Sequence, residues 1–132
     1  AQQVAVIRQM VMDLNWPMDI VAVPIVREAD GLALSSRNVY LSQEERTAAL
    51  VLSRALQKAK TVLQAGERRG AVVEAAAKEE LAQEALAAVE YVKLVDAATM
   101  QPVTELQGPA VLALAVRIGK TRLIDNMLWE AY

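Results

Sequence analysis

The chain has 132 residues, of which 55% are hydrophobic, and a formal net charge of −2. That length and apolar content suffice for a buried core and argue against disorder, and the slightly acidic balance argues against nucleic acid as a partner. Cysteine and histidine are both absent, which excludes disulfides, Cys-based metal sites and the commonest general base. No apolar run approaches the ~20 residues of a membrane span and no signal peptide is visible, so we expect a cytoplasmic protein without a membrane partner.

Residues 1–24 have the pattern of a helix followed by a buried strand. Apolar residues recur at helical spacing from Val4 to Leu14, and Pro17 prevents continuation. Residues 20–23 are continuously apolar, which is typical of a strand covered on both faces. We therefore expect residues 1–24 to be the last αβ unit of a Rossmann-like nucleotide-binding domain, and the chain to be the C-terminal part of a longer enzyme.

Residues 25–132 have the pattern of a second, α+β domain, joined to the first at a hinge near Pro24. Ser42 and Glu45 have capping-box spacing, so a long helix is expected at 43–65, and a second helix at 71–87. Strands are expected at 90–96, 110–116 and 122–128, with a tight hairpin at Gly119-Lys120. Together they predict a three-stranded antiparallel sheet packed on helices, with Asp125 and Asn126 as polar groups at its edge.

Residues 27–46 contain the densest set of polar motifs. Asp30-Gly31 is a tight-turn dipeptide, and Ser35-Ser36-Arg37 places two hydroxyls and a guanidinium in succession. Hydroxyls form short hydrogen bonds, and the guanidinium fork matches phosphate oxygens. The segment predicts a loop that holds an anion, although the same residues also fit an ordinary hairpin and a solvated helix start.

Three segments closely resemble the pantothenate synthetase (pantoate–β-alanine ligase) family. Residues 26–38, VREADGLALSSRN, followed by Tyr40-Leu41, resemble the C-terminal active-site segment of the family. Gln2-Gln3, followed by Ile7-Arg8, resembles the helix after the family's Lys-Asp pair, and residues 121–126, TRLIDN, resemble its closing strand. The order and spacing of all three fit, and the resemblance covers essentially the whole chain.

The resemblance implies an adenylate-forming ligase with ATP and Mg²⁺ as cofactors. Pantoate would be activated as pantoyl adenylate with release of pyrophosphate, and the β-alanine amine would then displace AMP. Attack at the α-phosphate builds negative charge, which positioned cations and hydrogen-bond donors stabilise. The family further implies a homodimer for the intact enzyme.

The resemblance also assigns site residues position by position. The implied nucleotide-binding residues are Val26, Leu34, Ser35, Ser36 and Arg37. Of these, Arg37 and Ser35 are the implied catalytic pair on the triphosphate, Leu34 contributes backbone contacts, and Val26 lines the adenine side. Gln3 is implied to contact pantoate, and no residue is assigned as a metal ligand.

The family's paired histidines and its Lys-Asp motif do not occur in this sequence, so we expect the chain alone to be inactive. Two other interpretations stay open. One is a different adenylyltransferase with a Ser-Ser-Arg loop. The other is a non-enzymatic interaction or dimerisation module that pairs subunits through its sheet edge.

Overall fold

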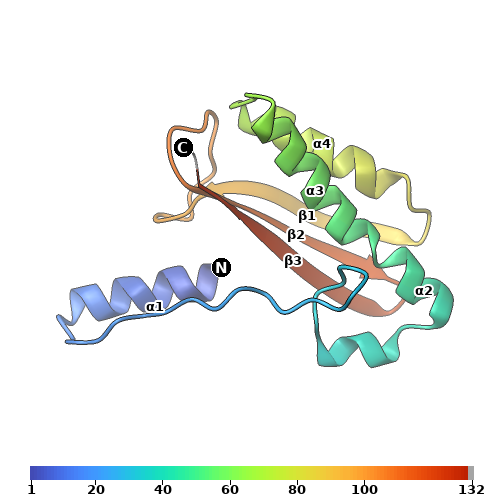
Figure 1. The fold of residues 1–132 in the computed structure, drawn as a ribbon, viewed down its shortest axis with the longest axis horizontal. Helices are drawn as coiled ribbons and strands as arrows, with labels where there is room; N and C mark the ends of the chain where they lie inside the picture. The colour runs from blue at the N-terminus through green and yellow to red at the C-terminus, as the bar shows by residue number, and fades with distance from the viewer. Residues whose placement is uncertain (131–132) are drawn as a thin grey trace.

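The fold is built on a three-stranded antiparallel sheet, in the order β1-β2-β3, covered on one face by helices (Figure 1). The computed structural model describes residues 1–130. Its helices are α1 (Gln2–Asp13), the 3-10 helix η1 (Ser36–Tyr40), α2 (Gln43–Ala48), α3 (Val51–Gln64) and α4 (Gly70–Ala82). Its strands are β1 (Ala87–Asp96), β2 (Ala110–Ile118) and β3 (Thr121–Trp129). The α+β class and the three antiparallel strands are therefore confirmed.

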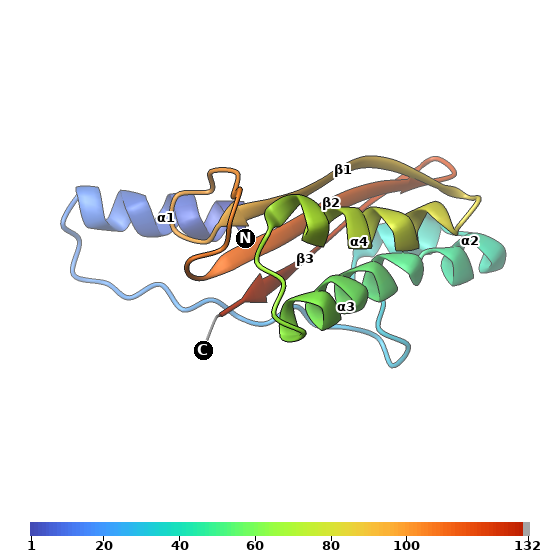
Figure 2. The same cartoon turned by 90° about the horizontal axis from the view of Figure 1, so that it is seen from above.

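The core lies between the sheet and the helix pair α3–α4, which Figure 2 shows as a second layer over the sheet. Val92 of β1 pairs with Leu114 of β2, and Leu94 pairs with Leu112, so these side chains share the helix-facing side. All four are buried. Both helices add fully buried side chains to the core, among them Leu63 of α3 and Val73 and Leu81 of α4. Full burial of such a side chain contributes about 1.5–3 kcal/mol.

The β2–β3 hairpin has the two-residue loop that the sequence predicts. Ile118 pairs with Thr121, and Gly119 takes a φ of 61°. A side chain at Gly119 would be strained by that dihedral, and a Cβ atom there would clash with the Glu45 carboxylate. The tip of the hairpin therefore lies directly against the start of α2.

The single helix predicted for 43–65 is wrong, because the structure has two helices, α2 and α3. The amide of Leu50 bonds to Thr47 and that of Leu52 to Ala49, three residues back instead of four. No glycine or proline marks this break in the sequence. On the α2 side of the break, Glu45 lies against Gly119 of the hairpin tip.

The helix predicted for 71–87 is shorter than expected, since α4 ends at Ala82. One face of α4 packs into the core, because Val73, Ala77 and Leu81 are buried. Ala85 lies beyond the helix and is exposed. The chain turns here, where the amide of Ala87 bonds to the carbonyl of Glu84, and β1 begins immediately. Only Ala87 of the predicted helix belongs to the strand, and residues 83–86 form the turn that precedes it.

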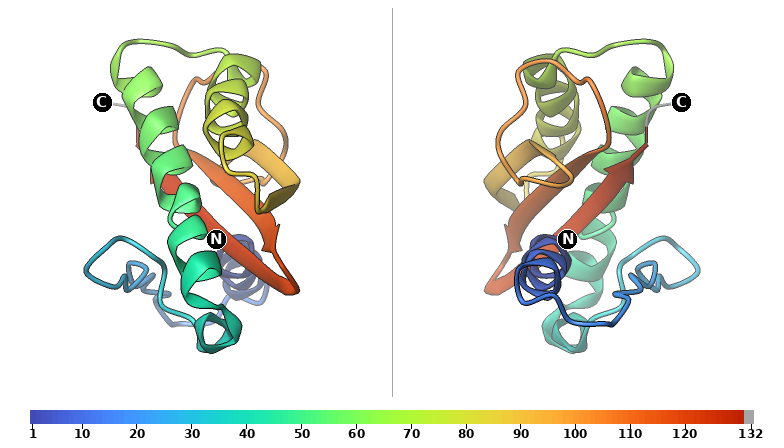
Figure 3. Two further views of the ribbon diagram at one scale, coloured as in Figure 1. Left: turned by 90° about the vertical axis from the view of Figure 1, so that its right-hand side faces the viewer. Right: turned by 90° about the vertical axis from the view of Figure 1, so that its left-hand side faces the viewer.

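Residues 1–26 stand apart from this two-layer unit (Figures 1 and 3). The predicted first helix is confirmed, and Asn15 ends it with a φ of 50°. The predicted strand at 20–23 is wrong for this structure, because these residues pair with no strand in residues 1–130. Val21 and Val23 are 81% and 79% exposed. A strand needs a hydrogen-bonded neighbouring strand, whereas the hydrogen bonds of a helix lie within the helix itself.

No helix within residues 1–130 is long and apolar enough to cross a bilayer.

Candidate functional site

Residues 27–33 form a tight hairpin that carries the polar loop. Arg27 and Ala33 pair as an antiparallel bridge, and the amide of Leu34 donates to the carbonyl of Val26 at 2.8 Å. Gly31 takes a φ of 98°, which closes a short turn of the kind that favours glycine. The tight turn predicted at Asp30-Gly31 is confirmed.

The hairpin is fixed to β3 by a bidentate ion pair. Arg27 donates through Nη1 to Oδ2 of Asp125 at 2.6 Å and through Nη2 to Oδ1 at 2.9 Å. The Asp125 side chain is only 2% exposed. The hydrogen bonds that Arg27 donates to Asp125 raise the pKa of Arg27 above its ordinary value, and the same guanidinium also donates to the carbonyl of Gly31 at 3.1 Å. The sequence placed Asp125 at the sheet edge but did not identify its partner.

A second arginine fixes the hairpin to α2. Nη2 of Arg46 lies 3.0 Å from a carboxylate oxygen of Asp30 and also pairs with Glu28. This contact lowers the pKa of the Asp30 carboxyl. Arg46 therefore holds the turn of the hairpin against α2, and Arg27 holds the first arm of the hairpin against β3.

The Ser35-Ser36-Arg37 loop follows the hairpin directly and begins η1. The Ser35 hydroxyl accepts a hydrogen bond from the amide of Arg37 at 3.2 Å, which caps η1. The side-chain amide of Asn38 donates to the carbonyl of Ala33 at 3.0 Å and fastens η1 to the hairpin. Ser35, Ser36 and Arg37 are all exposed. The Arg37 guanidinium has no hydrogen-bond or ion-pair partner within residues 1–130.

A cavity of about 780 Å³ lies between η1 and the tip of the β2–β3 hairpin. It is lined by Arg37, Tyr40, Glu45, Gly119, Lys120, Thr121 and Arg122. Residues 36–40 and this hairpin tip lie at the same end of the sheet, next to α2 (Figure 1). Three cationic side chains and one carboxylate line the cavity, which favours an anionic ligand. The sequence identified Arg37 but missed Lys120 and Arg122, because only the fold brings the hairpin to the loop.

The chain matches the sequence profile of the family described as Pantoate-beta-alanine ligase over residues 1–128. The chain belongs to that family. The pantothenate synthetase of Heliobacterium modesticaldum is 59% identical over 130 residues, and that of a Thermoanaerobacter species is 52% identical over 129 residues. Each alignment covers 98% of this chain and 46% of the relative. The chain thus spans about half the length of the curated pantothenate synthetases that it matches.

Solved structures of the family share the fold. The crystal structure of pantothenate synthetase from Thermus thermophilus has a TM-score of 0.87 at 43% identity, covering 96% of this chain and 45% of that one. The pantoate-beta-alanine ligase from Francisella tularensis, complexed with Beta-gamma ATP and β-alanine, has a TM-score of 0.54 at 27% identity. That match covers 96% of this chain and 40% of the other.

The structure brings together only part of the predicted site. Arg37 lines the cavity, and Ser35 and Ser36 lie in the same loop. Val26 and Leu34 are exposed and hydrogen-bonded neighbours at the open end of the hairpin, outside the cavity lining. Gln3 is exposed at the start of α1, also outside it. The roles of these residues remain predictions. Within the described residues, no group of three or more acidic side chains is placed to hold a metal ion.

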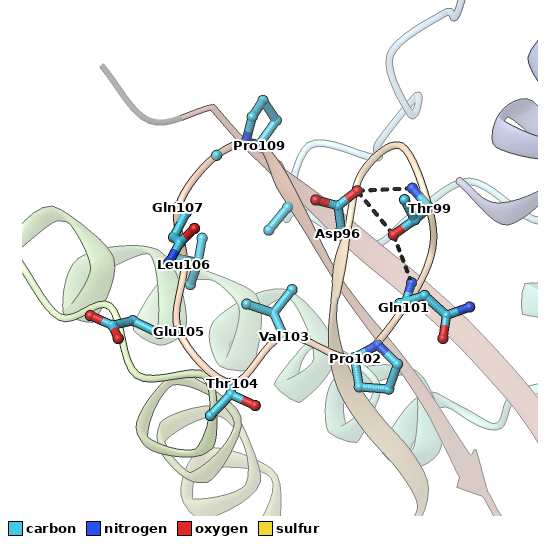
Figure 4. Close-up of a pocket in the computed structure, with 12 residues that line it drawn as sticks. Asp96, Thr99, Gln101, Pro102, Val103, Thr104, Glu105, Leu106, Gln107 and Pro109 are labelled. Atoms are coloured by element: carbon cyan, nitrogen blue, oxygen red, sulfur yellow. Dashed lines mark hydrogen bonds between the residues drawn. The ribbon is translucent and has the colours of Figure 1, made fainter.

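A second cavity, of about 650 Å³, lies in the β1–β2 connection (Figure 4). Oδ1 of Asp96 accepts hydrogen bonds from the amides of Ala98 and Thr99 and from the Thr99 hydroxyl. These bonds lower the pKa of Asp96. The carboxylate is thus engaged in folding its own loop, and the lining of this cavity includes no cationic side chain for a phosphate.

Proposed function

We propose that the chain is part of an ATP-dependent ligase that condenses pantoate and β-alanine through a pantoyl adenylate. We further propose that the loop of residues 34–37 binds the triphosphate. The observation that carries the proposal is the exposed guanidinium of Arg37, which has no partner within residues 1–130 and lines a cavity with two other cations, directly after a hairpin anchored to β3 and α2. Membership of the family supports the reaction, and the Francisella relative was solved with Beta-gamma ATP and β-alanine.

In the first step, a carboxylate oxygen of pantoate attacks the α-phosphorus of ATP and the bond to pyrophosphate breaks. In the second, the β-alanine amine attacks the acyl carbon, loses a proton and displaces AMP. Arg37 would hold phosphate oxygens with its planar fork of donors, and the Ser35 hydroxyl would add a short hydrogen bond. The hairpin that precedes this loop is fixed to β3 and α2, which limits how far the loop backbone has to move as charge develops. Mg²⁺ bound to the phosphates would supply further positive charge.

The other predicted residues have supporting roles in this proposal. Ser36 stabilises the loop, Leu34 offers its backbone to the nucleotide, and Val26 lies on the adenine side. Gln3 contacts pantoate through its side-chain amide, which can both donate and accept. We assign residues 1–24 to a nucleotide-binding domain and residues 25–132 to a lid domain of a cytoplasmic, homodimeric enzyme, and the 132-residue chain alone should lack ligase activity.

The test is Arg37→Ala in the full-length enzyme, with adenylate formation followed in single turnovers. Loss of a transition-state charge partner should slow this step by about 10²-fold or more. Arg8→Ala is a matched control, because Arg8 is also exposed and lies outside the cavity. An unchanged rate for Arg37→Ala would remove this residue from the mechanism.

Substrate choice tests the reaction itself. Among carboxylic acids offered with ATP and Mg²⁺, only pantoate should give β-alanine-dependent release of AMP. Equal release with unrelated acids would favour a different adenylyltransferase. Robust pantothenate formation by the 132-residue chain alone would contradict the proposed division of the site.

A further inference from the structure

We propose that Lys120, at the tip of the β2–β3 hairpin, is a second phosphate-binding cation opposite Arg37. The ligand group is a di- or triphosphate, held by the loop on one side and the hairpin on the other. This inference rests on the proposed function, because it adds a residue to the same site.

Lys120 and Arg37 line one cavity, although 83 positions separate them in the sequence. The loop and the hairpin meet because η1 packs against β3. At about 780 Å³, the cavity is large enough for a phosphate chain and part of its nucleotide. The arrangement thus provides two cations that can face one polyanion.

Neither of these two side chains forms an ion pair within residues 1–130. Neighbouring arginines are paired: Arg27 with Asp125, Arg46 with Asp30 and Glu28, and Arg122 with Glu90. Among the described residues, neither Arg37 nor Lys120 has a carboxylate within ion-pair distance. An unpaired cation needs no existing salt bridge to be broken when a phosphate binds.

The one carboxylate in the cavity lining has a structural task. Oε1 of Glu45 accepts a hydrogen bond from the amide of Ser42 at 3.0 Å, which completes the capping box of α2. The same side chain lies against Gly119. Glu45 therefore fixes the hairpin tip next to α2 and, with it, the backbone of Lys120.

The two cations have complementary chemistry. A guanidinium binds two phosphate oxygens through a rigid fork, whereas an ammonium is a compact charge with three donors on a flexible stem. Arg37 would orient the phosphates, and the flexible Lys120 ammonium would stabilise the negative charge that builds up on the leaving pyrophosphate. Nε of Arg122 donates to Oε2 of Glu90 at 2.6 Å, so its guanidinium is held in place at the edge of the cavity.

The experiment is Lys120→Ala in the full-length enzyme, with KM measured for each substrate and Ki measured for inorganic pyrophosphate. We expect KM for ATP and Ki for pyrophosphate to rise about tenfold, which corresponds to one charged contact, with KM for pantoate and β-alanine unchanged. Lys120→Arg should restore both values. Lys60→Ala, an exposed lysine of α3 outside the cavity, is the control and should change neither.

The outcomes separate this inference from the proposed function. If Arg37→Ala impairs adenylate formation while Lys120→Ala leaves ATP and pyrophosphate binding intact, the second cation is wrong and the ligase stands. A general rise in KM for all three substrates, or no rescue by Lys120→Arg, would indicate a structural role and overturn the inference. If pantoate is not ligated at all, the proposed function fails, and direct binding of inorganic pyrophosphate to wild type and Lys120→Ala still decides whether Lys120 binds phosphate.

Discussion

The chain contains two regions, and the more apolar one is the less well packed: 17 of 26 residues are hydrophobic in residues 1–26, against 53 of 104 in residues 27–130. In residues 1–26, α1 buries only Val11, and several large apolar side chains are exposed, including Met12, Leu14, Trp16 and Met18. In residues 27–130, apolar side chains from α3, α4 and the sheet form one buried cluster. The helix forms in both regions because its hydrogen bonds are local, whereas strands form only where a neighbour is present. Hydrophobicity alone therefore does not determine burial.

The largest expected contrast between the regions is a leucine truncation. Leu114→Ala should lower the free energy of unfolding by about 2–5 kcal/mol, because it leaves a cavity under α3 and α4. Leu14→Ala, at a position 52% exposed, should stay within about 0.5 kcal/mol. Urea denaturation of both variants measures the difference, and equal losses would contradict the distinction between the two regions.

The next effect tests the ion pair that joins the loop to the packed region. Asp125→Ala should lower the free energy of unfolding by about 2 kcal/mol, because it leaves the partly buried Arg27 without its partner. The double variant Arg27→Met/Asp125→Leu should recover most of this loss by removing both charges. Denaturant unfolding of these variants and the matching single variants gives the coupling. If the double variant is as unstable as the sum of the two single variants, the pair does not act as a unit.

A smaller, pH-dependent effect is expected in the α3–α4 connection. The side-chain hydrogen bond from Arg69, followed by amide hydrogen bonds, lowers the pKa of Glu67 to about 2. A lowered pKa in the folded state stabilises above the unfolded value near 4.5, and this contribution is lost as pH falls towards 2. The Tm difference between wild type and Glu67→Gln should therefore shrink from about pH 6 to about pH 2. A constant difference would show that the carboxylate is not protonated selectively on unfolding.

The smallest expected effect comes from deleting residues 1–24. Because this segment buries only Val11 and adds no strand to the sheet, the remaining chain should keep its unfolding free energy within about 1 kcal/mol. Calorimetry of the shortened and full chains makes the comparison. A collapse of the cooperative transition would show that α1 is integral to the core.

Much of the fold was predictable because its signals are local. Alternating and continuous apolar runs located all three strands, and Gly119 located the hairpin between the second and third. The capping box at Ser42 and Glu45 was correct. The break between α2 and α3 was not predictable, since no glycine or proline marks it in the sequence.

In the candidate site, too, the local motifs were predictable and the long-range contacts were not. Ser35, Ser36 and Arg37 were recognisable as a string, and the structure places them in one loop. The anchoring of that loop was missed, because Arg27 and Asp125 are 98 positions apart along the chain and no periodicity connects an arginine to its carboxylate at that distance. Lys120 was interpreted only as part of a turn, for the same reason.

The sequence by itself located the three strands, the β2–β3 hairpin and the helical regions of residues 43–82, and it identified the family through the strings around Arg37 and Thr121. Only the tertiary structure decided that Arg27 is paired with Asp125, that Arg37 is left without a partner among the described residues, and that Lys120 lies across a shared cavity from it. The physical reason is the distance along the chain over which each kind of interaction acts. Propensity and capping act between residues a few positions apart, whereas the availability of a charge for a ligand depends on every group that the fold brings within a few ångströms.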